Sequence, residues 1–280
     1  MILVWGISWP VAKIGLQYMP ALWFSAYRLI IGTFTMFPMV LLLGKLVLPR
    51  KKDLKIILIF GIIQIAIFMS FLNAGLYYID AGKAAILVYT TPIWVVPISI
   101  FFFKEESTGM KWIGFLFGII GILILFNPFE INWHNRDEIF GSVLLLTAAL
   151  SWAIAILCAR YMEWTRPPLE LISWQLLVGT IPVVILAMIL QPHPQMVWNN
   201  SLILSLIYSG IFATGFAYWG TIVVSKELPP TTTSLSLLAV PICGLIFSAI
   251  LLHEKITLSI LCAMLFILGG LLCVIIRRKV

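Results

Sequence analysis

Long apolar runs, separated by short polar or proline-containing connections, follow one another along the whole chain. A membrane-spanning helix uses roughly 20 residues, so windows of about 19 residues suit the search for candidate spans. Ten spans follow from the pattern: Ile2–Tyr18, Ser25–Leu43, Ile56–Tyr78, Ala84–Phe103, Trp112–Phe126, Ile139–Ala159, Leu171–Leu190, Leu202–Val224, Ser234–Leu252 and Leu258–Ile276. Prolines stand in several connections, as in Met19-Pro20 and Pro229-Pro230, where they cannot continue a helix. The pattern predicts an all-α membrane protein with ten transmembrane helices.

The composition supports this class of protein. Of the 280 residues, 62% are hydrophobic and only 10% are charged, whereas about 25% of an ordinary soluble protein is charged. Ten helices of roughly 20 residues leave little chain for an appended catalytic or nucleic-acid-binding domain. The segment from Met1 to Met19 has no basic leader and no small-residue cleavage site. We therefore expect it to be a retained helix and not a signal peptide.

The formal net charge of +7 has a topological explanation. With both termini placed inside, thirteen Lys and Arg residues fall in inner connections, and three, Lys83, Arg136 and Lys255, fall in outer ones. Such an excess is typical of cytoplasmic loops. We predict a multi-pass protein of the bacterial cytoplasmic (inner) membrane with both termini in the cytoplasm. The charge then requires no nucleic-acid partner, and the lipid bilayer is the expected surrounding.

The two halves of the chain resemble each other at a nearly fixed offset. Matching residues at 149 positions apart are Gly61 and Gly210, Pro92 and Pro241, Glu105 and Glu254, and Gly121 and Gly270. Matching residues at 147 positions apart are Trp5 and Trp152, Lys13 and Arg160, Gly32 and Gly179, and Thr33 and Thr180. Five helices are thus duplicated, which predicts one repeat over residues 1–127 and a second over 138–280. Because five is odd, the second copy lies inverted in the membrane, as in many secondary transporters.

Short motifs carry a resemblance to a known family. They are Trp5-Gly6, Pro10-Val11-Ala12-Lys13, Pro20 and Arg28, together with the proline-containing fourth and ninth spans that end in Lys104-Glu105 and His253-Glu254. In these features the whole chain resembles the EamA family of the drug/metabolite transporter superfamily. The resemblance implies a ten-helix exporter-type fold with a central cavity lined by helices one, three, four, six, eight and nine. It also implies a small-metabolite substrate without specifying which one.

Ionisable residues within the predicted spans are candidates for function, because a charge in the bilayer is costly. Lys13 lies toward the outer end of the first span and Arg28 near the outer start of the second. Two interpretations stay open for both residues. They reach the interface or support the structure, or they hold an anionic group such as a substrate carboxylate. No Asp or Glu lies at mid-depth in any span, which disfavours proton coupling through a buried carboxylate.

Glu105 and Glu254 are candidate gating or structural residues, because they end equivalent helices on opposite faces of the membrane. A carboxylate at a helix C-terminus opposes the macrodipole. Each is therefore expected to have a nearby lysine partner or to form a gate contact. Within the same helices, Pro92 and Pro241 remove a backbone donor and leave a carbonyl unbonded at an expected kink. We expect the helices to move about these two prolines.

Gly114, Gly118 and Gly121 form a small-residue face in the fifth span. Such faces allow close helix contact. The face serves packing within the chain or a dimer interface, so the sequence is compatible with a monomer or a homodimer.

The polar and aromatic residues at mid-depth are the candidate substrate-binding set. They are Trp5, Trp9, Ser70, Asn73, Tyr77, Tyr89, Thr90, Thr91, Trp152, Tyr218, Trp219, Ser234 and Ser236. Ser70, Asn73 and Tyr77 follow helical spacing on one face of the third span. The rings suit apolar or cationic parts of a solute, although aromatic packing alone would also place them in a helix bundle. A site with hydroxyls, an amide and rings suits a neutral or zwitterionic solute such as an amino acid.

The sequence offers no sign of a metal, a cofactor or a catalytic group. Its four cysteines form no CxxC pair, its three histidines form no HExxH motif, and no nucleophile or paired acids share one depth. We predict a secondary transporter that exports small metabolites and is not an enzyme. Multidrug efflux or uptake of a specific metabolite is the alternative, followed by a membrane scaffold or an intramembrane enzyme.

Overall fold

Helices make up every element of the computed structural model within residues 1–106, 108–126, 135–253 and 258–275, which are the residues that it describes. Seven helical segments are long and apolar enough to cross a membrane: Ala21–Leu42, Lys51–Tyr78, Ala81–Phe101, Arg136–Tyr161, Pro168–Leu190, Asn200–Glu227 and Pro230–Leu252. Three shorter apolar helices cover Ile2–Leu16, Gly109–Ile124 and Leu261–Gly270. The prediction of an all-helical, multi-pass membrane protein is confirmed. The count of ten spans and their inverted arrangement stay predictions.

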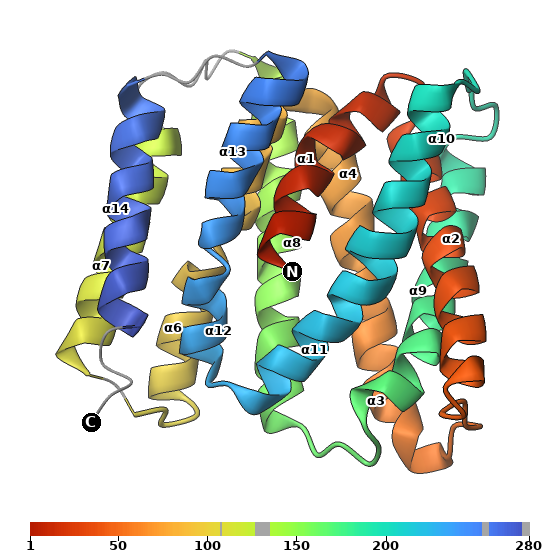
Figure 1. Cartoon of the computed structure of the whole chain (residues 1–280), viewed down its shortest axis with the longest axis horizontal. Coiled ribbons are helices and arrows are strands. Elements are labelled where there is room, and N and C mark those ends of the chain that lie inside the picture. The colour runs from red at the N-terminus through yellow and green to blue at the C-terminus, as the bar shows by residue number, and fades with distance from the viewer. Residues whose placement is uncertain (107, 127–134, 254–257, 276–280) are drawn as a thin grey trace.

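The helices stand side by side in one bundle (Figure 1). The elements before residue 127 are α1 (Ile2–Leu16), α2 (Ala21–Leu42), η1 (Lys51–Asp53), α3 (Leu54–Ile59), η2 (Phe60–Ile67), α4 (Phe68–Tyr78), α5 (Ala81–Val88), α6 (Thr91–Phe101) and α7 (Gly109–Phe126). Those after residue 134 are α8 (Arg136–Tyr161), α9 (Pro168–Leu190), α10 (Asn200–Ile207), η3 (Tyr208–Phe216), α11 (Ala217–Glu227), α12 (Pro230–Ser236), α13 (Ala239–Leu252) and α14 (Leu258–Ile275).

The bundle has two ends, which we name from their positions in Figure 1. The upper end holds the α1–α2, α4–α5 and α9–α10 connections. The lower end holds the α2–η1, α6–α7, α8–α9 and α11–α12 connections. These names describe the figure and do not assign a side of the membrane.

Two of the long segments contain a π-helical stretch, η2 and η3, in which hydrogen bonds join residues five positions apart. The stretch η2 packs on α9, and η3 packs on α2. Glycines make both crossings close: a Cβ added at Gly32 would lie 3.1 Å from the Gly210 carbonyl oxygen, and one at Gly179 would lie 2.5 Å from that of Gly61. The two glycine pairs bring the backbones together near the middle of the bundle.

Prolines break two other segments. Helix α5 ends at Val88 and α6 begins at Thr91, with Pro92 in its first turn, while α12 ends at Ser236 and α13 begins at Ala239, two residues before Pro241. The carbonyl expected to be unbonded before Pro92 has a partner in the structure. The Thr91 hydroxyl donates to the Val88 carbonyl at 2.9 Å. A threonine thus stabilises the break from within the helix.

Helices α7 and α14 pack along each other at one edge of the bundle (Figure 1). A Cβ at Gly121 would lie 3.0 Å from the Ala263 carbonyl oxygen, and one at Gly270 would lie 2.7 Å from the Gly114 carbonyl oxygen. The small-residue face of the fifth predicted span therefore contacts another helix of the same chain. The oligomeric state stays a prediction.

Candidate functional site

A narrow cavity of about 40 Å³ lies in the interior of the bundle, between residues from both halves of the chain. Its walls come from α1, α2, α4, α5, α6, α8 and α11. The lining residues are Trp5, Ser8, Trp9, Ala12, Arg28, Phe68, Met69, Leu72, Asn73, Leu76, Val88, Tyr89, Thr91, Trp152 and Tyr218. Small-molecule sites usually enclose about 300–1,000 Å³. The walls must therefore move apart before a solute fits.

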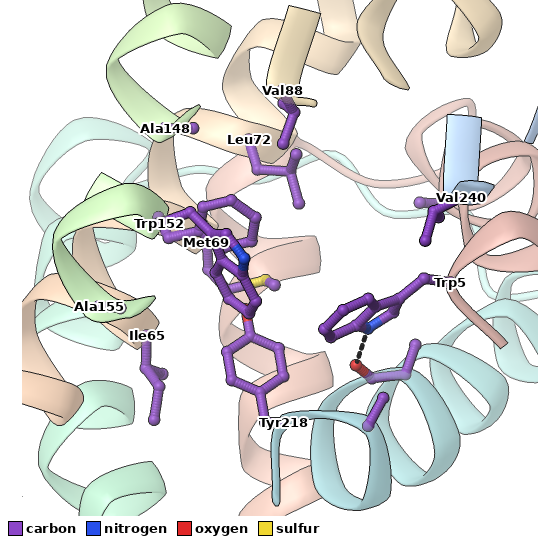
Figure 2. Close-up of a cluster of buried hydrophobic side chains, with 14 of the residues drawn as sticks. Trp5, Ile65, Met69, Leu72, Val88, Ala148, Trp152, Ala155, Tyr218 and Val240 are labelled. Carbon is purple, nitrogen blue, oxygen red and sulfur yellow. Dashed lines mark hydrogen bonds between the residues drawn. The ribbon is translucent and has the colours of Figure 1, made fainter. Parts of the chain in front are cut away.

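Aromatic rings from three helices meet on one side of this cavity. Figure 2 shows Trp5, Trp152 and Tyr218 within one cluster of buried side chains. The Trp5 and Trp152 ring centroids are 5.4 Å apart in an edge-to-face arrangement, and Trp152 and Tyr218 are also 5.4 Å apart. The Trp5 indole donates to the Ala213 carbonyl at 3.0 Å, which fixes its ring plane. One turn further along α1, Trp9 lies edge-to-face with Tyr89, with ring centroids 6.3 Å apart.

Several polar groups interrupt the apolar wall, including Arg28, Asn73 and Tyr218. Arg28 is 3% exposed, and its Nε donates to the Thr214 hydroxyl at 3.1 Å. Asn73 is fully buried; its amide nitrogen donates to the Ser25 hydroxyl at 2.8 Å, while its Oδ1 has no hydrogen-bond partner. The buried Tyr218 hydroxyl has none either. Unpaired buried polar atoms are costly, and these two oxygens have unused hydrogen-bonding capacity.

The structure divides the polar residues of the third predicted span between two spaces. Asn73 lines the central cavity, whereas Ser70 and Tyr77 line a second pocket of about 740 Å³. We call it the upper pocket, because its lining includes the α1–α2 connection and the ends of α4 and α9. Residues seven positions apart differ by about 20° around a helix, but residues three apart differ by about 60°. The Ser70 and Tyr77 side chains therefore project in nearly the same direction, toward the upper pocket, whereas Asn73 projects in a different direction, toward the central cavity.

The other members of the predicted set have different surroundings. Thr91 lines the cavity, but its hydroxyl and that of Thr90 already donate to carbonyls of the preceding turn. The Ser234 hydroxyl donates to the Thr231 carbonyl at 3.1 Å within α12. Ser234, Ser236, Thr90 and Trp219 line neither the central cavity nor the upper pocket. Binding of a solute by any member of the set stays a prediction.

Lys13 and its partner in the repeat, Arg160, both contact helix C-termini. The Lys13 ammonium donates to the carbonyls of Leu76 and Ile79 at 2.8 and 2.7 Å, at the upper end of α4. The Arg160 guanidinium donates to the Lys226 carbonyl at 2.7 Å, at the lower end of α11. Cations at helix C-termini are favourable because carbonyls there have no partner in the helix. These contacts support the structural interpretation for Lys13.

Glu105 joins three elements at the lower end. One carboxylate oxygen lies 3.2 Å from the Lys111 ammonium, and the other accepts a hydrogen bond from the Thr231 backbone N–H at 3.3 Å, in the first turn of α12. Lys111 is one of the lysines near the end of that span, where a partner was expected. The matching residue Glu254 lies outside the described residues. Gating by either glutamate, or by Pro92 and Pro241, stays a prediction.

A buried ionic cluster at the lower end was not predicted from the sequence. Asp53 is fully buried, accepts a hydrogen bond from the Arg50 backbone N–H at 2.7 Å, and lies 3.1 Å from the Arg166 Nε. Thr165 also donates to Asp53, and Arg166 pairs with Glu170 at 3.1 Å. The cluster ties η1 to the α8–α9 connection. Its one sequence signal is an acid among the basic residues at 50–55.

Comparisons with known proteins agree with this architecture. The model of the EamA-like transporter family matches residues 1–127 and 139–276. An uncharacterized transporter of Bacillus subtilis (strain 168), YoaV, is 31% identical over 96% of this chain and 92% of its own length. A probable amino-acid metabolite efflux pump of Escherichia coli (strain K12) is 30% identical over 96% of this chain and 90% of its own length.

A solved crystal structure has the same fold. It superposes with a TM-score of 0.78 at 18% sequence identity, covering 98% of this chain and 94% of that one. At this identity the likeness supports the fold alone, whereas the family model and the relatives named as transporters extend to function. Both relatives are named as transporters. The chain belongs to the EamA-like transporter family.

Proposed function

We propose that this protein is a secondary transporter that exports small zwitterionic metabolites such as amino acids. The observation that carries the proposal is the central cavity, which both halves of the chain line with rings and a few polar groups. Rings suit the apolar part of such a solute, and Arg28, Asn73 and Tyr218 suit its polar part. The Escherichia coli relative is named a probable amino-acid metabolite efflux pump, which supports the substrate class and the direction.

The proposal includes ten spans in two inverted five-helix repeats, over residues 1–127 and 138–280. Residue 127 and residues 276–280, at the ends of these repeats, lie outside the described residues. Several contacts support it. The matched Thr33 and Thr180 hydroxyls lie 3.1 Å apart, and the matched Trp5 and Trp152 rings touch, as expected on a twofold axis. Other matched features occur once in each half: the two π-helical stretches, the crossings at Gly32 and Gly179, and positive φ angles at Lys104 and His253.

Alternating access is the mechanism that such an arrangement supports. Each of the segments broken before Pro92 and Pro241 has one part at the upper end and one at the lower end. Rocking of the third and fourth predicted spans against the eighth and ninth, about Pro92 and Pro241, would open one end while closing the other. The narrow central cavity corresponds to a state in which the walls have closed.

The proposed orientation has the lower end of the bundle facing the cytoplasm of a bacterial cell, with α1 beginning midway between the two ends and continuing to the upper end (Figure 1). The basic residues of the lower-end connections support it. A thiol-reactive probe added outside intact cells should label Gln195→Cys but not Lys51→Cys. Labelling of Lys51→Cys before the membrane is permeabilised would reverse the orientation.

A flux assay tests the function. Liposomes that contain the purified protein and are preloaded with radiolabelled amino acids should release them faster than preloaded liposomes without protein. Trp152→Ala, in the cavity, should slow the flux of bulky neutral amino acids more than that of glycine. Trp198→Ala is the matched control, because this ring is 54% exposed in the α9–α10 connection. Absence of flux across a broad metabolite panel, with folded protein, would exclude the transporter function.

A further inference from the structure

Arg28 differs from the other cation within a predicted span in having unused hydrogen-bond donors. A guanidinium carries five N–H donors. Among the described residues, Arg28 has one hydrogen bond, from Nε to the Thr214 hydroxyl, and no carboxylate partner. Lys13, by contrast, donates to backbone carbonyls. The two terminal amino groups of Arg28 therefore remain available on the cavity wall.

Two consecutive hydrogen bonds fix the position of this guanidinium. The Thr214 hydroxyl accepts from Arg28 and itself donates to the Ser209 carbonyl at 2.8 Å, within the π-helical stretch η3. This chain of hydrogen bonds holds Nε on the side of η3 and leaves the opposite edge of the planar guanidinium for another partner. That edge suits a carboxylate, which binds a guanidinium through two parallel hydrogen bonds.

The repeat provides an internal comparison that separates a structural from a recognition role. At the positions equivalent to Arg28 and Thr214, the other half carries Gln175 and Ile65, both buried. The same helix crossing therefore forms without a charge and without a hydroxyl. A buried charge is costly in the membrane unless it is paired. Since the crossing does not need this charge, its retention in one half points to a ligand.

The Asn73 amide on the cavity wall offers a hydrogen-bond acceptor, whereas Arg28 offers only donors. The Asn73 amide nitrogen donates to Ser25 and to the Met69 carbonyl, so its Oδ1 is left as an acceptor without a partner. An ammonium group donates hydrogen bonds only, and it is also attracted to the faces of aromatic rings such as Trp9 and Tyr89. The wall thus offers a cationic donor and, separately, an acceptor with rings.

We infer that Arg28 binds the carboxylate of the transported solute and thereby selects amino acids and related carboxylates over the corresponding amines. The assignment rests on the proposed function, because it assumes that the central cavity is the solute site. In this arrangement the ammonium group of the solute faces Asn73 Oδ1 and the rings, and the apolar side chain contacts the Trp5 and Trp152 side of the cavity. A solute without a carboxylate leaves Arg28 unpaired.

Binding of three probes to the purified full-length protein tests the inference. L-phenylalanine carries both charged groups, phenethylamine lacks the carboxylate, and 3-phenylpropionate lacks the ammonium. Affinities are measured by calorimetry in detergent for the wild type, Arg28→Gln and Arg28→Lys. Arg136→Gln is the matched control, because this arginine is exposed at the start of α8. Monodispersity and thermal unfolding identify any variant that does not fold.

For the wild type and Arg136→Gln, the affinity for phenylalanine should be at least about ten-fold higher than that for phenethylamine. Phenethylamine has no carboxylate, so it cannot form the paired, charge-assisted hydrogen bonds. Arg28→Gln should weaken the two carboxylate probes at least ten-fold and leave phenethylamine unchanged. Arg28→Lys should show the same selective loss to a smaller extent, because an ammonium cannot bind a carboxylate through a planar fork. If Arg28→Gln does not fold, the selective loss in Arg28→Lys decides the question.

Equal losses for all three probes, or no loss in a folded Arg28 variant, would overturn the assignment while leaving the proposed function intact. Failure of the wild type to bind any of the probes would instead contradict the amino-acid substrate and the assignment with it.

Discussion

The two ends of the bundle are held together differently. At the upper end, Lys83 and Glu138 join the two halves at 3.9 Å, with side chains 61% and 26% exposed, beside a pocket of about 740 Å³. At the lower end, Asp53 and Arg166 join them at 3.1 Å, with side chains 0% and 15% exposed. An exposed ion pair contributes little, whereas breaking a buried one leaves a costly unpaired charge.

The ion pair that joins the halves is thus more buried at the lower end, whereas at the upper end they are also joined by hydrogen bonds from the Val197 N–H to the Tyr18 carbonyl and from the Trp23 indole to the Gln191 carbonyl, both at 2.9 Å. The glycine crossings near the middle occur in both halves and do not distinguish the ends. Glu105 adds to the lower end by joining α6, Lys111 and the start of α12.

The largest effect is expected at the buried ion pair. Asp53→Ala should lower the free energy of unfolding by about 3 kcal/mol, because Arg166 and the Arg50 backbone N–H lose their acceptor. The matched change at the upper end, Glu138→Ala, should cost less than about 1 kcal/mol. Thermal unfolding in detergent measures both. Equal costs would contradict the difference between the ends.

The two helix-end cations provide a second, intermediate comparison. Lys13→Met should cost about 1–2 kcal/mol, because the α4 carbonyls that it contacts are partly buried. Arg160→Met should cost less, since Arg160 is exposed and its contacts are open to solvent. Thermal unfolding of the two variants, side by side, gives the ranking. A larger loss for Arg160→Met would show that exposure does not set the strength of these caps.

The smallest effect concerns the balance between states. Glu105→Gln removes the ion pair with Lys111 and weakens the contact with the Thr231 N–H, so about 1 kcal/mol, or a fivefold change in population, should favour opening of the lower end. Glu106→Gln is the control, because this neighbour is exposed. Spin-label distances across the lower end measure the shift. If both variants give the same distances, Glu105 has no role in opening the lower end.

The sequence predicted those features of the fold that depend on local residue type and not on contacts with distant parts of the chain. Apolar runs predicted the helices, and Pro92 and Pro241 predicted where two of them are interrupted. The π-helical stretches were not predicted. They lie where η2 packs on α9 and η3 packs on α2, and these contacts join residues far apart in the chain.

The candidate site shows the same division. Trp5, Trp152 and Tyr218 stand out as mid-span aromatic residues, and all three line the cavity. Met69 and Leu72 line it as well, but an apolar residue at a cavity has no sequence feature that separates it from one facing lipid. The sequence also left two interpretations for Arg28, since its contact with Thr214 lies 186 positions away.

The central claim is that the two ends open in alternation, and equivalent pairs of spin labels test it most directly. The upper pair is Tyr78→Cys with Gln195→Cys, both of which line the upper pocket. The lower pair occupies the matching positions, Leu48→Cys with Glu227→Cys, 147 and 149 residues away. Both are measured by pulsed electron resonance on protein in lipid, after replacement of the four native cysteines, with and without solute. Conditions that shorten the upper distance should lengthen the lower one. Two distances that stay constant, or that increase and decrease together, would contradict the account.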